Sequence, residues 1–92
     1  MTRMQRSYLE RIDLGILAQS ANLAHLREQS LRASIADFRQ SSIENADRSV
    51  GTEDEEIWRL RISRCDYMLA ELQDDTLRKM AHEALDWWER GT

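Results

Sequence analysis

The clearest pattern of apolar and polar positions lies between residues 52 and 72. Apolar residues recur there at alternating steps of four and three, the spacing that presents one apolar seam along a helix. Ile57 and Met68 lie beside this seam and widen it. The seam itself consists of Trp58, Ile62, Cys65, Leu69 and Leu72. We therefore predict an amphipathic helix over about residues 53–73 that packs on a neighbour along this seam.

A capping pattern marks the start of this helix. Thr52 and Glu55 have the spacing of a capping box, in which the two side chains accept hydrogen bonds from free amides of the first turn. Acidic residues occupy positions 53–56, where the helix dipole favours negative charge. Gly51 lets the chain turn before the cap. We place the preceding loop at about residues 46–52.

The N-terminal half has helical periodicity over a wider face. Ser7 and Glu10 repeat the capping spacing, and apolar residues then follow two stripes as far as Phe38. Over residues 9–26 the two stripes together cover roughly 240° of the helix circumference. No strong stop interrupts the pattern, so we predict one continuous helix over about residues 7–45. More than one neighbour is needed to cover so wide an apolar face.

The chain after Leu72 predicts a last helix. Residues 73–76 read Gln-Asp-Asp-Thr and offer caps for a new helix. The chain either restarts there with a bend near Asp74 or continues with a mild kink. Residues from about 75 to 90 place apolar side chains on one face, and Gly91 is a natural C-terminal stop.

The composition favours an all-α fold. The 92 residues contain no proline and three glycines, too few turn residues for a β-rich chain of this length. We predict a single domain over residues 1–92, built as a long antiparallel helical hairpin with arms of roughly 60 Å. We expect two copies to form a four-helix bundle, because one hairpin cannot cover residues 9–26. The alternative is a three-helix bundle monomer with a sharp bend near Asp74.

The distribution of charge bears on the partners. The formal net charge of −4 divides into +1 for residues 1–50 and −5 for residues 51–92, and an acidic chain is a poor nonspecific binder of nucleic acid. Arg59, Arg61 and Arg64 point in different directions around their helix. We therefore do not expect nucleic-acid binding as the main function. We keep as the alternative a DNA- or RNA-binding regulator that uses the arginines of the first helix together with Arg59, Arg61 and Arg64.

The sequence also bears on cellular location and on chemistry. No apolar run approaches the roughly 20 residues of a membrane span. The lone Cys65 fits a reducing compartment. We therefore expect a cytoplasmic protein without membrane contact. Cys65 lies on the seam, where a buried thiol acts as a small apolar side chain. His82 and Asp86 are one turn apart but lack a third metal ligand. We expect no enzyme activity, no cofactor and no metal.

Two charged residues interrupt the apolar faces. Glu28 lies in the middle of the first helical seam and Arg61 falls inside the apolar arc of the second. Each either reaches across an interface with a partner or extends along the helix to the edge of the bundle. We therefore name both as candidate interface residues, together with the apolar residues Leu9, Ile12, Ile16 and Leu23.

The adjacent tryptophans near the C-terminus are expected to play different parts. Neighbouring residues of a helix point about 100° apart, so Trp87 and Trp88 cannot face the same way. Trp88 is in line with Leu77, Ala81 and Ala84, and we assign it to the core. We assign Trp87 to a subunit or partner interface, with the alternative that it covers the end of the bundle.

These patterns predict a small, non-enzymatic helical protein. We expect it to act through helix-to-helix contact, as a homodimer and as an adaptor or regulator of another protein.

Overall fold

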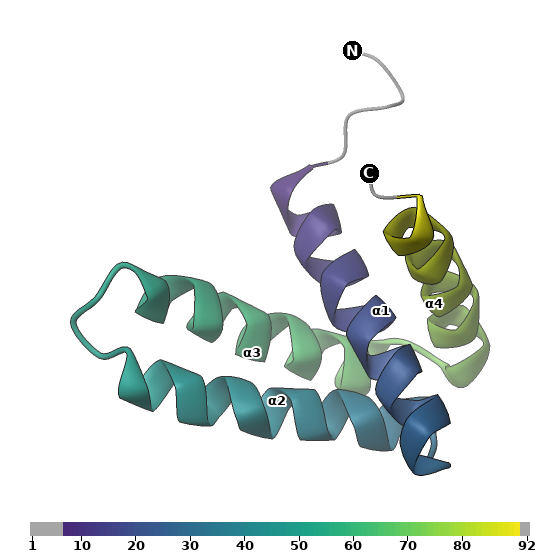
Figure 1. The fold of residues 1–92 in the computed structure, drawn as a ribbon, viewed down its shortest axis with the longest axis horizontal. Coiled ribbons are helices and arrows are strands. Elements are labelled where there is room, and N and C mark those ends of the chain that lie inside the picture. Colours follow the sequence, from purple (N-terminus) through teal and green to yellow (C-terminus); the bar gives the residue numbers. More distant parts are fainter. Residues whose placement is uncertain (1–6, 91–92) are drawn as a thin grey trace.

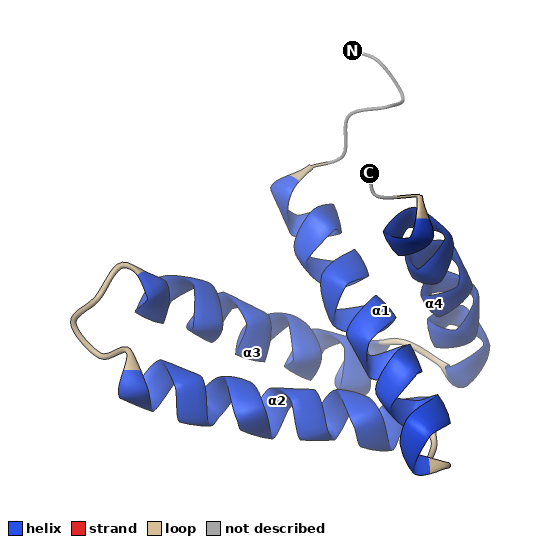
Figure 2. Cartoon of the chain, viewed as in Figure 1, coloured by secondary structure: helices blue, strands red, loops and turns tan. Residues whose placement is uncertain are grey.

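The computed structural model describes residues 7–90 and contains four α-helices. They are α1 (Tyr8–Arg27), α2 (Leu31–Arg48), α3 (Asp54–Glu71) and α4 (Asp74–Glu89). No strand is present within the described residues (Figure 2). The prediction of an all-α chain is therefore confirmed for this part of the sequence.

The four helices pack as two antiparallel pairs. α2 and α3 form a hairpin, and α1 crosses the open end of that hairpin with α4 beside it (Figure 1). The turn end of the hairpin extends beyond both α1 and α4. Because both predicted arms are folded back on themselves, the longest dimension of the chain is 38 Å, well short of the arms expected from the sequence.

The prediction of one continuous helix over residues 7–45 is wrong. α1 ends at Arg27, and Glu28 takes the left-handed conformation with φ of 51°. The Glu28 and Gln29 amides donate back to carbonyls of the last turn, which closes the helix end. Ser30 then caps α2, its hydroxyl accepting from the amide of Ala33 at 3.1 Å.

The two predicted helix starts have different outcomes. Ser7 caps α1 as expected, with its Oγ accepting from the Glu10 amide at 3.1 Å. The capping box at Thr52 is wrong, because α3 begins at Asp54 and the Thr52 hydroxyl instead donates to the Ser49 carbonyl at 2.7 Å.

The turn between α2 and α3 depends on Gly51. α2 continues to Arg48, three residues past the predicted end, and the turn occupies residues 49–53. Gly51 has φ of 84°, a conformation that favours glycine, and its amide donates to the Glu55 carboxylate at 3.1 Å. The predicted role of Gly51 in turning the chain is thereby explained.

The core lies where the two helix pairs meet. Its fully buried side chains come from all four helices, so the wide apolar face of α1 is covered by α2 and α4 of the same chain. A second copy is not needed for that purpose, which removes the original argument for a dimer. The core residues are Leu14, Ile16, Leu17, Ala18, Ile35, Cys65, Met68, Leu77 and Ala84.

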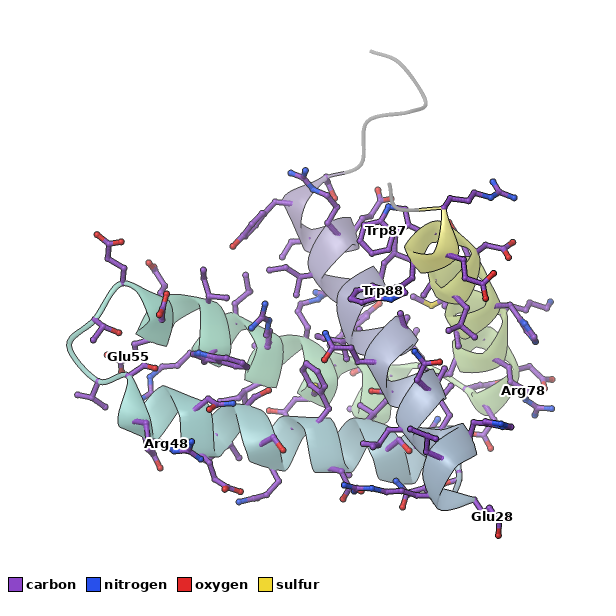
Figure 3. All side chains as sticks on the ribbon, in the orientation of Figure 1. Glu28, Arg48, Glu55, Arg78, Trp87 and Trp88 are labelled. Atoms are coloured by element: carbon purple, nitrogen blue, oxygen red, sulfur yellow. The ribbon has the colours of Figure 1, made fainter. Side chains whose placement is uncertain are left out.

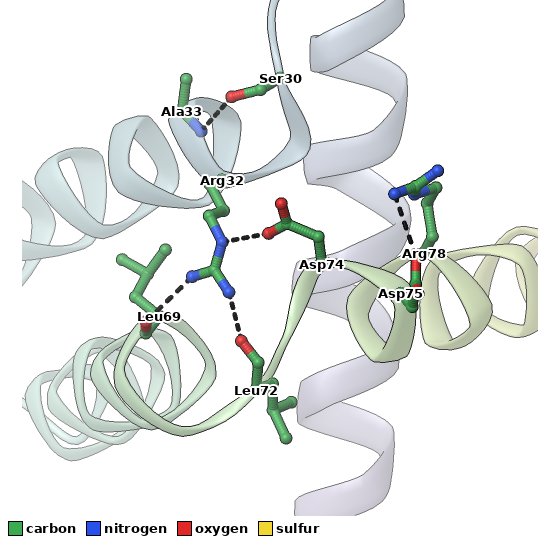
Figure 4. A network of polar contacts seen from close by, with 8 residues as sticks. All are labelled: Ser30, Arg32, Ala33, Leu69, Leu72, Asp74, Asp75 and Arg78. Atoms are coloured by element: carbon green, nitrogen blue, oxygen red, sulfur yellow. Dashed lines mark hydrogen bonds and ion pairs between the residues drawn. The ribbon is translucent and has the colours of Figure 1, made fainter.

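A single arginine holds the bend between α3 and α4. The Arg32 guanidinium, from the first turn of α2, donates to the carbonyls of Leu69 (2.9 Å) and Leu72 and to the carboxylate of Asp74 (Figure 4). These carbonyls lie at the end of α3, where a helix has acceptors without partners. Arg32 therefore links α2 to the end of α3 and the start of α4. The chain bends before α4 begins at Asp74, which is one of the two alternatives that the sequence predicted.

Candidate protein-interaction surface

A groove lies between the N-terminal half of α1 and the α2–α3 hairpin. It has a volume of about 340 Å³ and is open to solvent. Its α1 wall is one helix face, because the lining residues follow one another at alternating steps of three and one. The lining residues are Tyr8, Arg11, Ile12, Gly15, Ile16 and Gln19 of α1, with Phe38 of α2 and Arg61 of α3.

Arg61 is one of the charged residues that the sequence singled out, and its position is now defined. Its guanidinium lies over the Trp58 ring, 4.5 Å from the ring centroid, where the negative face of the indole attracts a cation. This contact orients the side chain along the groove wall. Within residues 7–90, neither Arg61 nor Arg11 has a carboxylate partner, so the groove combines an apolar floor with two unpaired guanidinium groups.

Gly15 stands out in the α1 wall of the groove. Glycine in the interior of a helix costs roughly 0.5–1 kcal/mol relative to alanine. A Cβ built at Gly15 meets no atom within 4 Å, so no neighbour within the chain requires the missing side chain. No pattern in the sequence indicated a role for Gly15, and the groove supplies one: at this point the α1 wall is open to close approach from outside.

The α1 wall is held against α3 by an ion pair. Arg64 donates to both carboxylate oxygens of Asp13, at 2.8 and 2.7 Å, and both side chains are largely covered. The hydrogen bonds to Asp13 raise the pKa of the Arg64 guanidinium above its ordinary value. Arg64 also lies 4.6 Å from the centroid of the Tyr67 ring. This pair fixes the angle at which α1 leaves the hairpin, and therefore the shape of the groove.

The turn end of the hairpin presents a different surface. Val50 and Ile57 are 63% and 37% exposed there. Glu53, Asp54 and Glu56 surround them, are exposed, and form no ion pair within the described residues. Glu55 differs, because it pairs with Arg59 at 2.7 Å, four residues further along the helix. The turn end thus combines exposed apolar side chains with unpaired carboxylates.

The other predicted interface residues differ from Arg61 in position and in exposure to solvent. Glu28 is not in a seam at all: it ends α1 and points to solvent (Figure 3), and Arg32, four residues on, pairs with Asp74 instead of with Glu28. Ile16 is buried in the core and presents only its edge to the groove. Leu9 is 45% exposed, whereas Ile12 and Leu23 are partly buried.

The assignment of Trp88 to the core is wrong, whereas a role of Trp87 at an interface stays a prediction. Trp88 is 50% exposed, whereas Trp87 is partly buried and packs against the core. Their rings are 6.3 Å apart between α1 and α4 (Figure 3). Trp88 does follow Leu77 and Ala84 along one face of α4, but it lies in the last turn, where the helix reaches the edge of the core.

A second hollow of about 390 Å³ lies between the starts of α2 and α4. Two arginines line it, but each is paired: Arg32 with Asp74, and Arg78 with Asp75 at 3.2 Å (Figure 4). Its charge is therefore balanced within the chain, unlike that of the groove.

The structure also places the residues that the sequence analysis considered for catalysis or metal binding. Cys65 is fully buried as predicted, and this burial raises the pKa of its thiol to about 12, so the reactive thiolate is suppressed. His82 and Asp86 are exposed on α4, and no group of three or more potential metal ligands occurs among residues 7–90. In the same part of the chain, no helix has both the length and the apolar character needed to cross a membrane.

Comparison of the chain with protein-family models, with curated proteins and with solved structures found no match in any of the three.

Proposed function

We propose that this protein is a non-enzymatic helical protein that acts by contact with other proteins, as a homodimeric adaptor or regulator. The observation that carries the proposal is the groove between α1 and the hairpin, with its apolar floor, its two unpaired arginines and its glycine-containing wall. Apolar residues combined with arginine are typical of the centre of a protein interface.

The exposed apolar side chains support the same proposal. Tyr8, Leu9, Ile57 and Trp88 are each between about a third and a half exposed. They are spread over α1, α3 and α4, so one interface does not have to cover all of them. A homodimer contact on one face and a contact with another protein on a second face are compatible with this distribution.

Mass in solution tests the dimer. Light scattering on a gel-filtration peak at tens of micromolar is expected to give twice the 10.8 kDa mass of one chain. A mass of 10.8 kDa under these conditions would contradict the homodimer.

The alternative function is a regulator that binds DNA or RNA. Of the three α3 arginines that it would use, two are engaged within the chain, Arg59 with Glu55 and Arg64 with Asp13, which is why we place it second. A titration with random duplex DNA at low salt distinguishes the two functions. Tight binding that falls steeply with added salt supports the alternative, and no binding at low salt supports the protein-contact function.

A further inference from the structure

The open side of α3 carries a short line of residues of alternating character. Asp54, Ile57 and Arg61 are separated by three and four residues, so they lie on one face of the helix. Asp54 is exposed at the turn end, Ile57 is partly exposed, and Arg61 lines the groove. One face of α3 thus runs from an unpaired carboxylate through an apolar residue to an unpaired guanidinium.

These three residues of α3 are complementary to the same three residues of a second copy that runs in the opposite direction. Two α3 helices placed antiparallel, with a two-fold axis beside Ile57, bring Arg61 of each copy next to Asp54 of the other. The two Ile57 side chains then meet near the axis. A two-fold contact of this kind uses the same patch on both copies, so every favourable pair occurs twice.

We propose that the groove of one copy holds the turn end of the α2–α3 hairpin of a second copy, and the reverse, in a two-fold dimer with Arg61 of each chain paired to Asp54 of the other. The charges and polarities match. The groove offers Arg11, Arg61 and an apolar floor, and the turn end offers unpaired carboxylates beside Val50 and Ile57. In one chain the turn end extends beyond α1 and α4 (Figure 1). In the proposed dimer the α1 wall of the partner covers it.

Gly15 has a defined part in this dimer. The missing side chain lets the backbone of the incoming hairpin approach α1 closely, and nothing within the chain fills that space. A Cβ at Gly15 meets no atom of the chain within 4 Å, and the longer side chain of leucine would extend from it into the groove. Gly15→Leu is therefore expected to weaken dimerisation at least tenfold while the chain stays folded, as followed by its circular dichroism and its melting temperature.

This inference rests on the proposed homodimer, and charge reversal tests the two separately. Arg61→Glu places two carboxylates against each other at both contacts, and Asp54→Arg places two guanidiniums there. Sedimentation equilibrium is expected to show dimerisation at least tenfold weaker for each variant alone. Circular dichroism of the same samples verifies that the helices remain.

Mixing the two variants is the sharpest form of the experiment. A heterodimer of Arg61→Glu with Asp54→Arg has opposite charges at both contacts, so the mixture should recover dimers that neither variant forms alone. Native mass spectrometry identifies the heterodimer because the two chains differ in mass. The double variant in one chain should likewise dimerise with itself.

Two control variants change the same charges elsewhere. Lys79→Glu reverses an exposed cation on α4, and Asp75→Arg reverses an exposed acid in the first turn of α4 that pairs with Arg78 of the same helix. Both should leave dimerisation unchanged. A wild-type chain that stays monomeric would overturn the homodimer and this interface together. A wild-type dimer that both reversals leave intact, or a mixture without heterodimer, would overturn this interface alone.

Discussion

At the level of single residues, Glu28 has the least favourable backbone conformation. Among residues 7–90 it is the one non-glycine residue with positive φ, and that region crowds a Cβ against the backbone. Its side chain is exposed, so replacement removes no buried contact. Glu28→Gly is expected to stabilise the fold by about 0.5–1 kcal/mol in urea unfolding.

The matched control for Glu28 is Gly51, where glycine already occupies a position with φ of 84°. Gly51→Ala is expected to destabilise by about 1 kcal/mol or more, because alanine is strained there. A Glu28→Gly variant that is less stable than the wild type would contradict the left-handed conformation at the end of α1.

Ser20 carries a buried hydroxyl that has no hydrogen-bond partner within the described residues. A buried polar group without a partner costs free energy, and alanine also has the higher helix propensity. Ser20→Ala is therefore expected to stabilise by about 0.5–1 kcal/mol in chemical unfolding. Ser34→Ala should do the opposite, because the equally buried Ser34 hydroxyl accepts from the Gln29 amide group at 2.8 Å. Equal effects of the two substitutions would contradict this difference.

At the level of the helices, Arg32 is the residue on which the bend between α3 and α4 most depends. Three acceptors are arranged around one planar guanidinium, and a lysine ammonium cannot match that geometry. Arg32→Lys is expected to cost about 1–2 kcal/mol of stability. Arg78→Lys should change the stability by less than about 0.5 kcal/mol, because Arg78 makes an exposed contact with Asp75. An Arg32→Lys variant as stable as the wild type would show that other contacts hold the bend.

The turn before α3 should respond to pH through Glu55. The hydrogen bond from the Gly51 amide, followed by that from Arg59, lowers the pKa of Glu55 below its ordinary value of 4.5. The contribution of Glu55 to stability is therefore complete above pH 4.5 and is lost as the pH falls through the lowered pKa. NMR titration should give a pKa below 4.5 for Glu55. A pKa at or above 4.5 would contradict the contacts at the turn.

The sequence predicted the helices better than their ends. The Ser7 cap and the restart near Asp74 follow local rules that a sequence displays directly. The break at Glu28 was missed because one apolar stripe continues across it from Ala24 to Leu31, seven residues apart, and because the residue at the break is not a glycine. The Ser30 cap was the available signal. Arg32 reaches Leu72 across 40 positions of sequence, and no local pattern reveals such a contact.

The candidate surface was predictable only in part, for the same reason. Arg61 stood out because a charge fell inside an apolar arc, and it does line the groove. Arg11 and Gly15 gave no comparable signal, because their importance depends on the angle at which α1 crosses the hairpin. That angle depends on the pairing of Asp13 with Arg64, which are 51 residues apart.

At the level of the whole molecule, the chain covers its own wide apolar helix and leaves a different surface open. The open surface consists of the groove beside α1 and the turn end of the hairpin. Arg61 lines the groove, and both surfaces carry charges without partners among residues 7–90. Association through this surface, and not completion of the core, is the basis of the proposed function.

Amide hydrogen exchange at increasing protein concentration tests this claim most directly, because it reports which backbone becomes protected on association. Protection is expected to rise with concentration over residues 8–19 of α1 and 54–61 of α3, while α4 exchanges at a constant rate. Protection that does not depend on concentration, or that rises over α4 instead, would contradict the account.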